Sequence, residues 1–196
     1  MSVLIWSLPL LLLAQQKGAT PLPQSSVVNG QSSVTRAVVV GISDYQSQQV
    51  TDLAFADKDA IEFAKWLQSP AGGSLPIDNI SLLTNAAATS GNFAMALTGL
   101  IDESQPGDQA VIFFSGHGDV ETKTIFQLGF LLCYDSPPNN YMAGAFNLVN
   151  LQAVLSTLAA NNVRVLVVTD ACRSGELAGT GVNGPQLTNA NLAKQF

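Results

Sequence analysis

The amino-acid sequence predicts an α/β fold, a mostly parallel sheet with helices on both faces. Short β-branched runs of strand length alternate with longer segments of helical periodicity along most of the chain. The strand runs are apolar almost throughout, which is typical of parallel strands that are buried on both faces. The chain has 196 residues, of which 47% are hydrophobic, so it can bury the core of one sizeable domain.

The elements can be predicted in order along the chain. Residues 36–42 form a β-branched strand, and residues 54–68 form a helix because their apolar side chains recur on one broad side. Residues 79–84 supply a second strand. Residues 89–103 form a second helix, with Thr89 or Ser90 as its cap. The later elements are a strand at 109–115, a short strand or hairpin at 126–134, a helix at 148–160 and a strand at 163–169.

The amino-terminal segment has the character of a targeting sequence. Val3 to Ala14 is almost wholly apolar but too short to span a bilayer, so we expect a signal peptide over residues 1–19 and a secreted or periplasmic protein. The alternatives are a misassigned start or an uncleaved apolar tail, in which case the protein would be cytoplasmic. Residues 20–35, rich in Pro, Ser, Gln and Asn, are expected to form a linker.

Charge and composition exclude several classes of partner. The net charge is −6, and the eight Lys and Arg residues form no basic stripe, so we expect no nucleic-acid partner. We also find no stable membrane span, zinc-spaced Cys and His set, P-loop or dinucleotide fingerprint, and therefore expect no metal or organic cofactor. The acidic composition favours cationic peptides as ligands.

A thiol and an imidazole follow two of the predicted strands. His117, the single histidine of the chain, comes after the strand at 109–115 in what we expect to be a short Gly-His-Gly turn, and Cys172 comes after the strand at 163–169. The carboxyl ends of parallel strands meet at one edge of a sheet, where open α/β sheets place their ligands. An imidazole can take the proton of a thiol and return it to a leaving amine. The sequence therefore predicts a cysteine hydrolase with Cys172 as nucleophile and His117 as general base and acid.

Three motifs resemble those of the caspase-like cysteine peptidases, the clan of caspases, paracaspases and metacaspases. They are Ser115-Gly-His-Gly118, Asp170-Ala-Cys-Arg-Ser-Gly175, and Arg36 to Tyr45 followed by Leu53 to Ala60. The histidine precedes the cysteine by about 50 residues, which matches the known caspase spacing. The cysteine motif is closer to that of metacaspases than to that of caspases.

The resemblance implies a caspase-like three-layer sandwich, with a catalytic domain over residues 36–178. It also implies two further strands after Cys172, which the polar tail at 179–196 does not supply. We therefore expect a sandwich truncated at its carboxyl end, either because the chain is a fragment or because a separate small subunit completes it.

The resemblance assigns the oxyanion donors and a substrate pocket. The donors would be the backbone N–H groups of Gly118 and Cys172. Caspases bind a substrate aspartate with an arginine that residues 41–60 lack, and Asp170 stands two positions before Cys172, where caspases have a glutamine.

Asp59 matches the acidic residue that the family carries at the start of its first helix. We expect Asp59 and Asp170 to hold Arg or Lys before the scissile bond, with Ser115 as an additional contact. The ordinary alternatives are a first-turn acid favoured by the helix dipole at Asp59 and a turn cap at Asp170.

Two further expectations concern calcium and the second cysteine. Metacaspases often bind calcium through acids that follow the histidine, but residues 119–125 hold few acids, so we expect no cofactor here and keep calcium as the alternative. Cys133 lies in an apolar stretch and is expected in the core, without a disulfide to Cys172.

Three classes of function remain open at this point. The first is an endopeptidase that cleaves after Arg or Lys. The second is a non-catalytic caspase-like module that binds peptides. The third is a flavodoxin-like ligand-binding domain with an accidental Cys and His, although Gly41 to Tyr45 places an aspartate where a bound anion would lie.

Overall fold

The computed structural model describes residues 27–28 and 31–173 of the chain. Strands β1 (Val27–Val28) and β2 (Gln31–Ser32) form an antiparallel pair within the segment predicted as a linker. The predicted signal peptide at 1–19 and the predicted tail at 179–196 lie outside the described residues.

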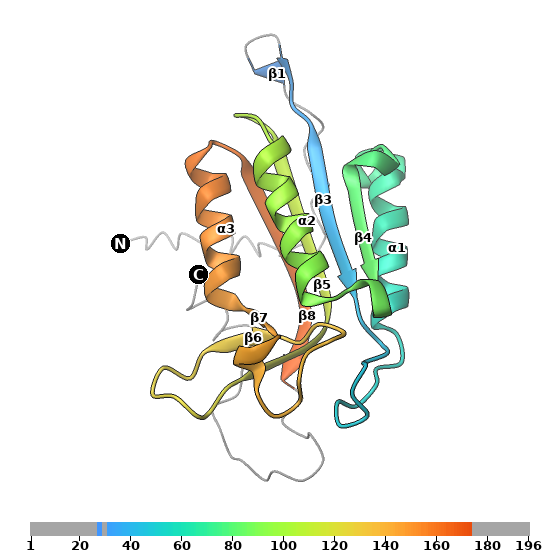
Figure 1. Cartoon of the computed structure of the whole chain (residues 1–196). Coiled ribbons are helices and arrows are strands. Elements are labelled where there is room, and N and C mark those ends of the chain that lie inside the picture. The colour runs from blue at the N-terminus through green and yellow to red at the C-terminus, as the bar shows by residue number, and fades with distance from the viewer. Residues whose placement is uncertain (1–26, 29–30, 174–196) are drawn as a thin grey trace, which may run out of the picture.

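A six-stranded mixed sheet forms the centre of the fold (Figure 1). Four parallel strands stand in the order β4, β3, β5, β8, and two short antiparallel strands continue the sheet beside the far end of β5. Their bounds are β3 (Thr35–Gly41), β4 (Ile80–Thr84), β5 (Gln109–Val120), β6 (Gly129–Leu131), β7 (Phe146–Asn147) and β8 (Arg164–Arg173). The predicted α/β class with a mostly parallel sheet is confirmed.

Helices cover both faces of this sheet (Figure 1). Helix α1 (Ala56–Gln68) buries small and apolar side chains against Val39, Val111 and Phe113 on one face. Helices α2 (Ser90–Glu103) and α3 (Leu148–Ala160) pack against each other and cover the opposite face. The Thr89 hydroxyl accepts a hydrogen bond from Asn92 N at 3.1 Å, which confirms Thr89 as the cap of α2.

Strand alternation divides the core into two halves. On β5, Val111 and Phe113 contribute to the α1 side, whereas Ile112 and Phe114 contribute to the side of α2 and α3. β8 follows the same alternation, because Leu166 and Val168 pack with the α1 side and Val165 and Val167 with the other. Odd positions of β5 and even positions of β8 therefore share the face that α1 covers.

The predicted ends of the last two parallel strands were wrong. β5 continues past residue 115 to Val120, and β8 continues past residue 169 to Arg173. The Gly-His-Gly segment is consequently part of a strand and not a turn. The reason is pairing on both sides: residues 116–118 of β5 pair with residues 171–173 of β8, and residues 118–120 pair with β6. The short strand or hairpin predicted at 126–134 is, in contrast, shorter than predicted, because only β6 forms a strand within that range.

The two glycines Gly41 and Gly99 differ in the space around them. A Cβ at Gly41, the last residue of β3, would overlap the carbonyl oxygen of Ala56 and the side chain of Ala60, so α1 can approach β3 only across a glycine. A Cβ at Gly99, inside α2, would meet nothing within 4 Å.

Gly41→Ala is therefore expected to lower the free energy of unfolding by about 2 kcal/mol or more, because the helix must move away from the sheet. Gly99→Ala should raise it by about 0.5–1 kcal/mol through helix propensity. Urea unfolding of both variants measures the difference. Equal changes in both variants would show that the close packing at Gly41 is not needed.

Candidate active site

The two residues predicted to react stand opposite each other on neighbouring strands. In the parallel register of β5 and β8, His117 is the Cα partner of Cys172, and Ser115 is the Cα partner of Asp170. Neighbouring strands lie about 4.8 Å apart, so the backbones of His117 and Cys172 are within reach of a direct contact between an imidazole and a thiol. Strand alternation places all four positions on the face that α1 covers.

His117 is held by the loop between β3 and α1. The side chain is buried, with 6% of its surface exposed, and its Nε2 lies 2.7 Å from the carbonyl oxygen of Thr51. A carbonyl oxygen can only accept a hydrogen bond, so Nε2 carries the proton and donates it. In the neutral ring, Nδ1 is then left with a free lone pair, as a general base requires.

The same loop contacts His117 through Tyr45. The phenol oxygen of Tyr45 accepts a hydrogen bond from His117 N at 2.9 Å. The two rings stack with centroids 5.1 Å apart and an interplanar angle of 27°. Burial is the main cause that raises the pKa of Tyr45 far above its ordinary value, so the phenol stays neutral.

Hydrogen bonds at both ends fix this loop. Ser43 Oγ donates to Asp57 Oδ1 at 2.6 Å, and Asp57 N donates to Ser43 Oγ at 3.0 Å. The side chain of Asn85 accepts from Ser43 N and Asp44 N. The hydrogen bond from Ser43 is the largest cause that lowers the pKa of Asp57. The loop is thus tied to the first turn of α1 and to the end of β4, which keeps the Thr51 carbonyl beside His117.

The N–H group of Gly118 is directed toward β8. The backbone N–H of His117 donates to the Tyr45 hydroxyl, and the backbone carbonyl of His117 accepts from Leu132 N at 2.9 Å. Both backbone polar groups of residue 117 therefore point away from β8. Successive residues of a strand direct their N–H and C=O groups to opposite sides. Gly118, the register partner of Arg173, therefore presents its N–H to the strand that carries Cys172.

The three residues predicted to bind substrate lie toward the carboxyl edge of the sheet, where Ser115 and Asp170 are register partners and Asp59 is in the first turn of α1. Ser115 is buried, with 2% of its surface exposed, whereas Asp59 in the first turn of α1 and Asp170 near the end of β8 are exposed. Phe63 of α1 stacks on Phe113 of β5 at a centroid distance of 4.4 Å. Asp59 is one helical turn before Phe63 and Ser115 is two strand residues after Phe113, so both lie toward the carboxyl edge of the sheet.

Cys133 is a core residue and is not part of the candidate active site. Its side chain is fully buried in the core between the sheet and helices α2 and α3. Desolvation, followed by the charge of Asp135, raises the pKa of the Cys133 thiol to about 12. The prediction that Cys133 is a core residue is confirmed, and a thiol with this pKa is a poor nucleophile near neutral pH.

Sequence reasoning missed the roles of Tyr45 and Thr51. A backbone carbonyl such as that of Thr51 has no sequence pattern, because any residue type supplies one. Tyr45 ends the motif that begins at Arg36, but its contact with His117 spans 72 positions of the chain. The one available signal was a large polar aromatic residue a few positions after a buried strand.

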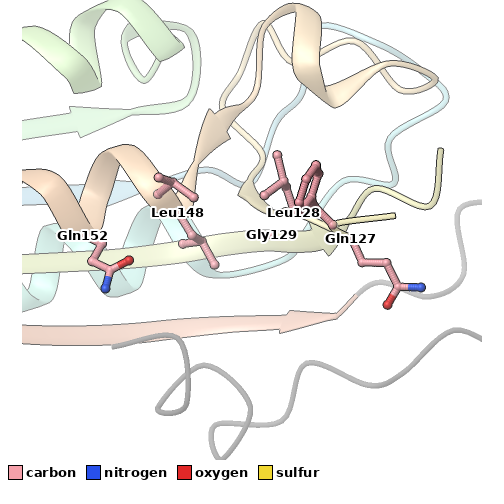
Figure 2. A pocket seen from close by; sticks show the side chains of 7 residues that line it. Gln127, Leu128, Gly129, Leu148 and Gln152 are labelled. Atoms are coloured by element: carbon pink, nitrogen blue, oxygen red, sulfur yellow. The ribbon is translucent and has the colours of Figure 1, made fainter. Parts of the chain in front are cut away.

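A surface pocket of about 220 Å³ lies elsewhere, between the start of α3 and the segment before β6 (Figure 2). Its lining is formed by Phe126, Gln127, Leu128, Gly129, Leu148, Val149 and Gln152. None of the predicted site residues lines it, so the pocket does not define the candidate active site.

The loop beside that pocket has a hydrogen-bonded base and an apolar tip. The Glu121 carboxylate accepts hydrogen bonds from the backbone N–H groups of Lys123 and Thr124 and from the Thr124 hydroxyl. The hydroxyl of Thr124 is the largest cause that lowers the pKa of Glu121. The tip exposes Ile125 by 92% and Phe126 by 75%.

Comparison with known proteins gives a family and a fold. A family model described as the caspase domain matches residues 34–194. The crystal structure of a structural-genomics target from Geobacter sulfurreducens is similar, with a TM-score of 0.57 and 22% sequence identity. The similarity covers 71% of this chain and 50% of that one, so the chain spans half the length of that protein. A search of the curated proteins gave no match. Within the part of the chain that the structure describes, no helix is long and apolar enough to cross a membrane.

Proposed function

The chain belongs to the caspase-domain family, and from this membership we propose that it is a cysteine endopeptidase of metacaspase type that cleaves after Arg or Lys. The observation that carries the proposal is the register of β5 and β8, which sets Cys172 opposite the single histidine of the chain. The hydrogen bond from His117 Nε2 to the Thr51 carbonyl adds the third group that a thiol–imidazole pair uses to orient its base.

The first half of the reaction forms an acyl-enzyme. His117 Nδ1 takes the proton of the Cys172 thiol, and the thiolate attacks the carbonyl carbon of the scissile bond. The carbonyl oxygen becomes an oxyanion, for which the N–H groups of Gly118 and Cys172 are the proposed donors. The tetrahedral intermediate collapses when His117 returns the proton to the amine, and the carbon–nitrogen bond breaks.

The second half releases the carboxylic acid. A water molecule gives a proton to His117 Nδ1 and attacks the thioester carbon, and the same N–H groups hold the oxyanion. The carbon–sulfur bond then breaks, and the proton returns to the sulfur. The chemistry needs no metal or organic cofactor, so we propose that neither calcium nor another ion takes part in the steps.

The proposed specificity rests on charge at the carboxyl edge of the α1 face. Ser115 pairs in register with Asp170, and the contact of Phe63 with Phe113 aligns the first turn of α1, with Asp59, toward the same edge. Two carboxylates there would pair with a guanidinium or ammonium group and repel a substrate carboxylate. The buried Ser115 hydroxyl would add a hydrogen-bond acceptor at the base of the pocket.

The outer edge of β8 supports the proposal of a partner. Residues 165–168 are apolar but partly exposed, and within the described residues β8 pairs on one side only, with β5. An exposed apolar strand edge is a template for another strand. We propose that further strands, from a small subunit or from a longer form of the protein, complete the sheet and the substrate groove. The same edge supports the second candidate function, a module that binds an extended peptide without cleaving it.

One experiment separates these functions. The full chain, alone and with the downstream part of its gene product, is incubated with fluorogenic peptides that end in Arg, Lys or Asp before the reporter group. Parallel samples contain calcium or a chelator. Hydrolysis of the Arg and Lys peptides that persists in chelator supports the proposed peptidase. Saturable binding of the peptides without hydrolysis in any sample would support the binding module instead.

We further propose that the protein is exported. If residues 1–19 are a signal peptide, the mature protein should begin between Gln15 and Thr20. Amino-terminal sequencing of the protein purified from its native host checks this boundary. Recovery of an intact Met1 from the cytosolic fraction would contradict export.

A further inference from the structure

We propose that Tyr45 is a positioning residue of the active site. Its hydroxyl accepts a hydrogen bond from the backbone of His117, and its ring stacks on the imidazole of His117. The inference rests on the proposed function, because a position for the imidazole matters only if the imidazole takes the proton of Cys172. It goes further in assigning a role to a residue that takes no part in the proposed chemical steps and acts through His117.

The two contacts of Tyr45 fix different degrees of freedom. The phenol oxygen accepts the backbone N–H of His117 at 2.9 Å, which fixes where the Cα of His117 lies along β5. The stacked rings, with centroids 5.1 Å apart, limit rotation of the imidazole about its side-chain bonds. Together with the bond from Nε2 to the Thr51 carbonyl, they leave Nδ1 in one orientation.

Tyr45 is itself held in place. Its ring is buried and its N–H donates to Asp52 Oδ1 at 3.1 Å. Gly116, the residue before His117, makes room for it, because a Cβ on Gly116 would lie 3.1 Å from the Tyr45 oxygen. This packing explains the first glycine of the Ser-Gly-His-Gly motif.

The phenol oxygen is the specific part of this arrangement. His117 N is buried and points away from β8, and at this position β3 has already ended, so no strand supplies an acceptor. A buried N–H without an acceptor is unfavourable, and the backbone would shift to find one. Phenylalanine would keep the stack but lose the acceptor, whereas leucine would lose both.

The test compares Tyr45→Phe and Tyr45→Leu with the unmodified full chain. We expect kcat to fall about tenfold in Tyr45→Phe and about 100-fold in Tyr45→Leu, with KM unchanged, because a displaced base lowers the rate of proton transfer without altering the substrate pocket. Alkylation of Cys172 by iodoacetamide provides a readout without substrate. The rate of alkylation should be lower in both variants than in the unmodified chain near pH 7. Above about pH 10, where the thiol ionises without a base, the rates of all three proteins should be equal.

Tyr141→Phe is the matched control. Tyr141 is also buried, but its hydroxyl donates to Asp119 Oδ2 at 2.7 Å, whereas the Tyr45 oxygen accepts from His117 N. A purely structural role for Tyr45 would give both phenylalanine variants the same loss of thermal stability and leave both alkylation profiles unchanged, which would overturn the proposal. Slower alkylation of the Tyr45 variants at every pH would also overturn it, since access to the thiol would then have changed.

The failure of this inference and that of the proposed function are distinguishable. If the unmodified chain, together with the strands proposed to complete its sheet, neither hydrolyses peptide nor shows alkylation that depends on His117, the proposed function fails, and the proposed role of Tyr45 fails with it. If the unmodified chain shows both and the Tyr45 variants match it, the positioning role alone is wrong.

Discussion

Replacing Cys172 by alanine is expected to abolish peptide hydrolysis, with a loss of at least about 10⁴-fold in kcat. The expectation follows from the register of β5 and β8, which sets no other thiol opposite His117 among the described residues. His117→Asn should cause a loss of similar size, and the double variant should be no worse than either single one, because the two groups act as a unit. Initial rates with a fluorogenic Arg peptide measure all three variants.

Cys133→Ala is the control for the loss of a thiol. Its side chain lies in the core, so the variant should lose some thermal stability but keep its kcat. Covalent labelling of the unmodified chain by a thiol reagent, followed by peptide mapping, should find the label on Cys172. Full activity of Cys172→Ala, or activity lost only in Cys133→Ala, would refute the assigned nucleophile.

The second large effect concerns the residue before the cleaved bond. Peptides with Arg or Lys at that place should be hydrolysed, and peptides with Asp should not. Asp170→Asn and Asp59→Asn should each lower kcat/KM for the Arg peptide by about tenfold or more, which corresponds to about 1.4 kcal/mol per lost charge pair. The physical reason is that a carboxylate partly removed from water by the substrate pairs with a cation and repels an anion.

Asp102→Asn controls for the change in net charge. Asp102 is an exposed acid near the carboxyl end of α2, which covers the sheet face opposite to α1, and its loss should leave kcat/KM for the Arg peptide nearly unchanged. If all three variants lost activity equally, general attraction between an acidic protein and a cationic peptide would explain the preference. Preferential cleavage after Asp by the unmodified protein would show that the pocket is of the caspase type.

Most helices and strands of the fold were predictable because their positions follow from the apolar periodicity of neighbouring residues. Helix α3 was predicted at its observed bounds, and α2 within one residue, since apolar periodicity and the Thr89 cap are properties of a few neighbouring residues. The carboxyl ends of β5 and β8 were not predicted correctly, because they depend on pairing between segments that are distant in the sequence. Gly116 and Gly118 predict a turn on their own, and only the neighbouring β6 and β8 keep that segment extended.

The candidate site was predictable to the same degree. His117 and Cys172 are rare residue types placed after apolar runs, and the motifs around them identify the family. The groups that orient His117 are a phenol and a main-chain carbonyl from a loop without regular structure. The hydrogen bonds of Ser43, Asp57 and Asn85 that shape this loop connect three separate elements, and such a network has no periodicity to detect.

The position of β8 also has a consequence during biosynthesis. β8 carries Cys172 and follows β6, β7 and α3 in the chain, so its pairing with β5 is a non-local contact that closes a long loop. A nascent chain is made from its amino end, and β5 with His117 can fold before β8 has emerged from the ribosome. The growing polypeptide therefore carries the proposed base before the proposed nucleophile, and the proposed peptidase activity would arise only after this late strand has paired with β5.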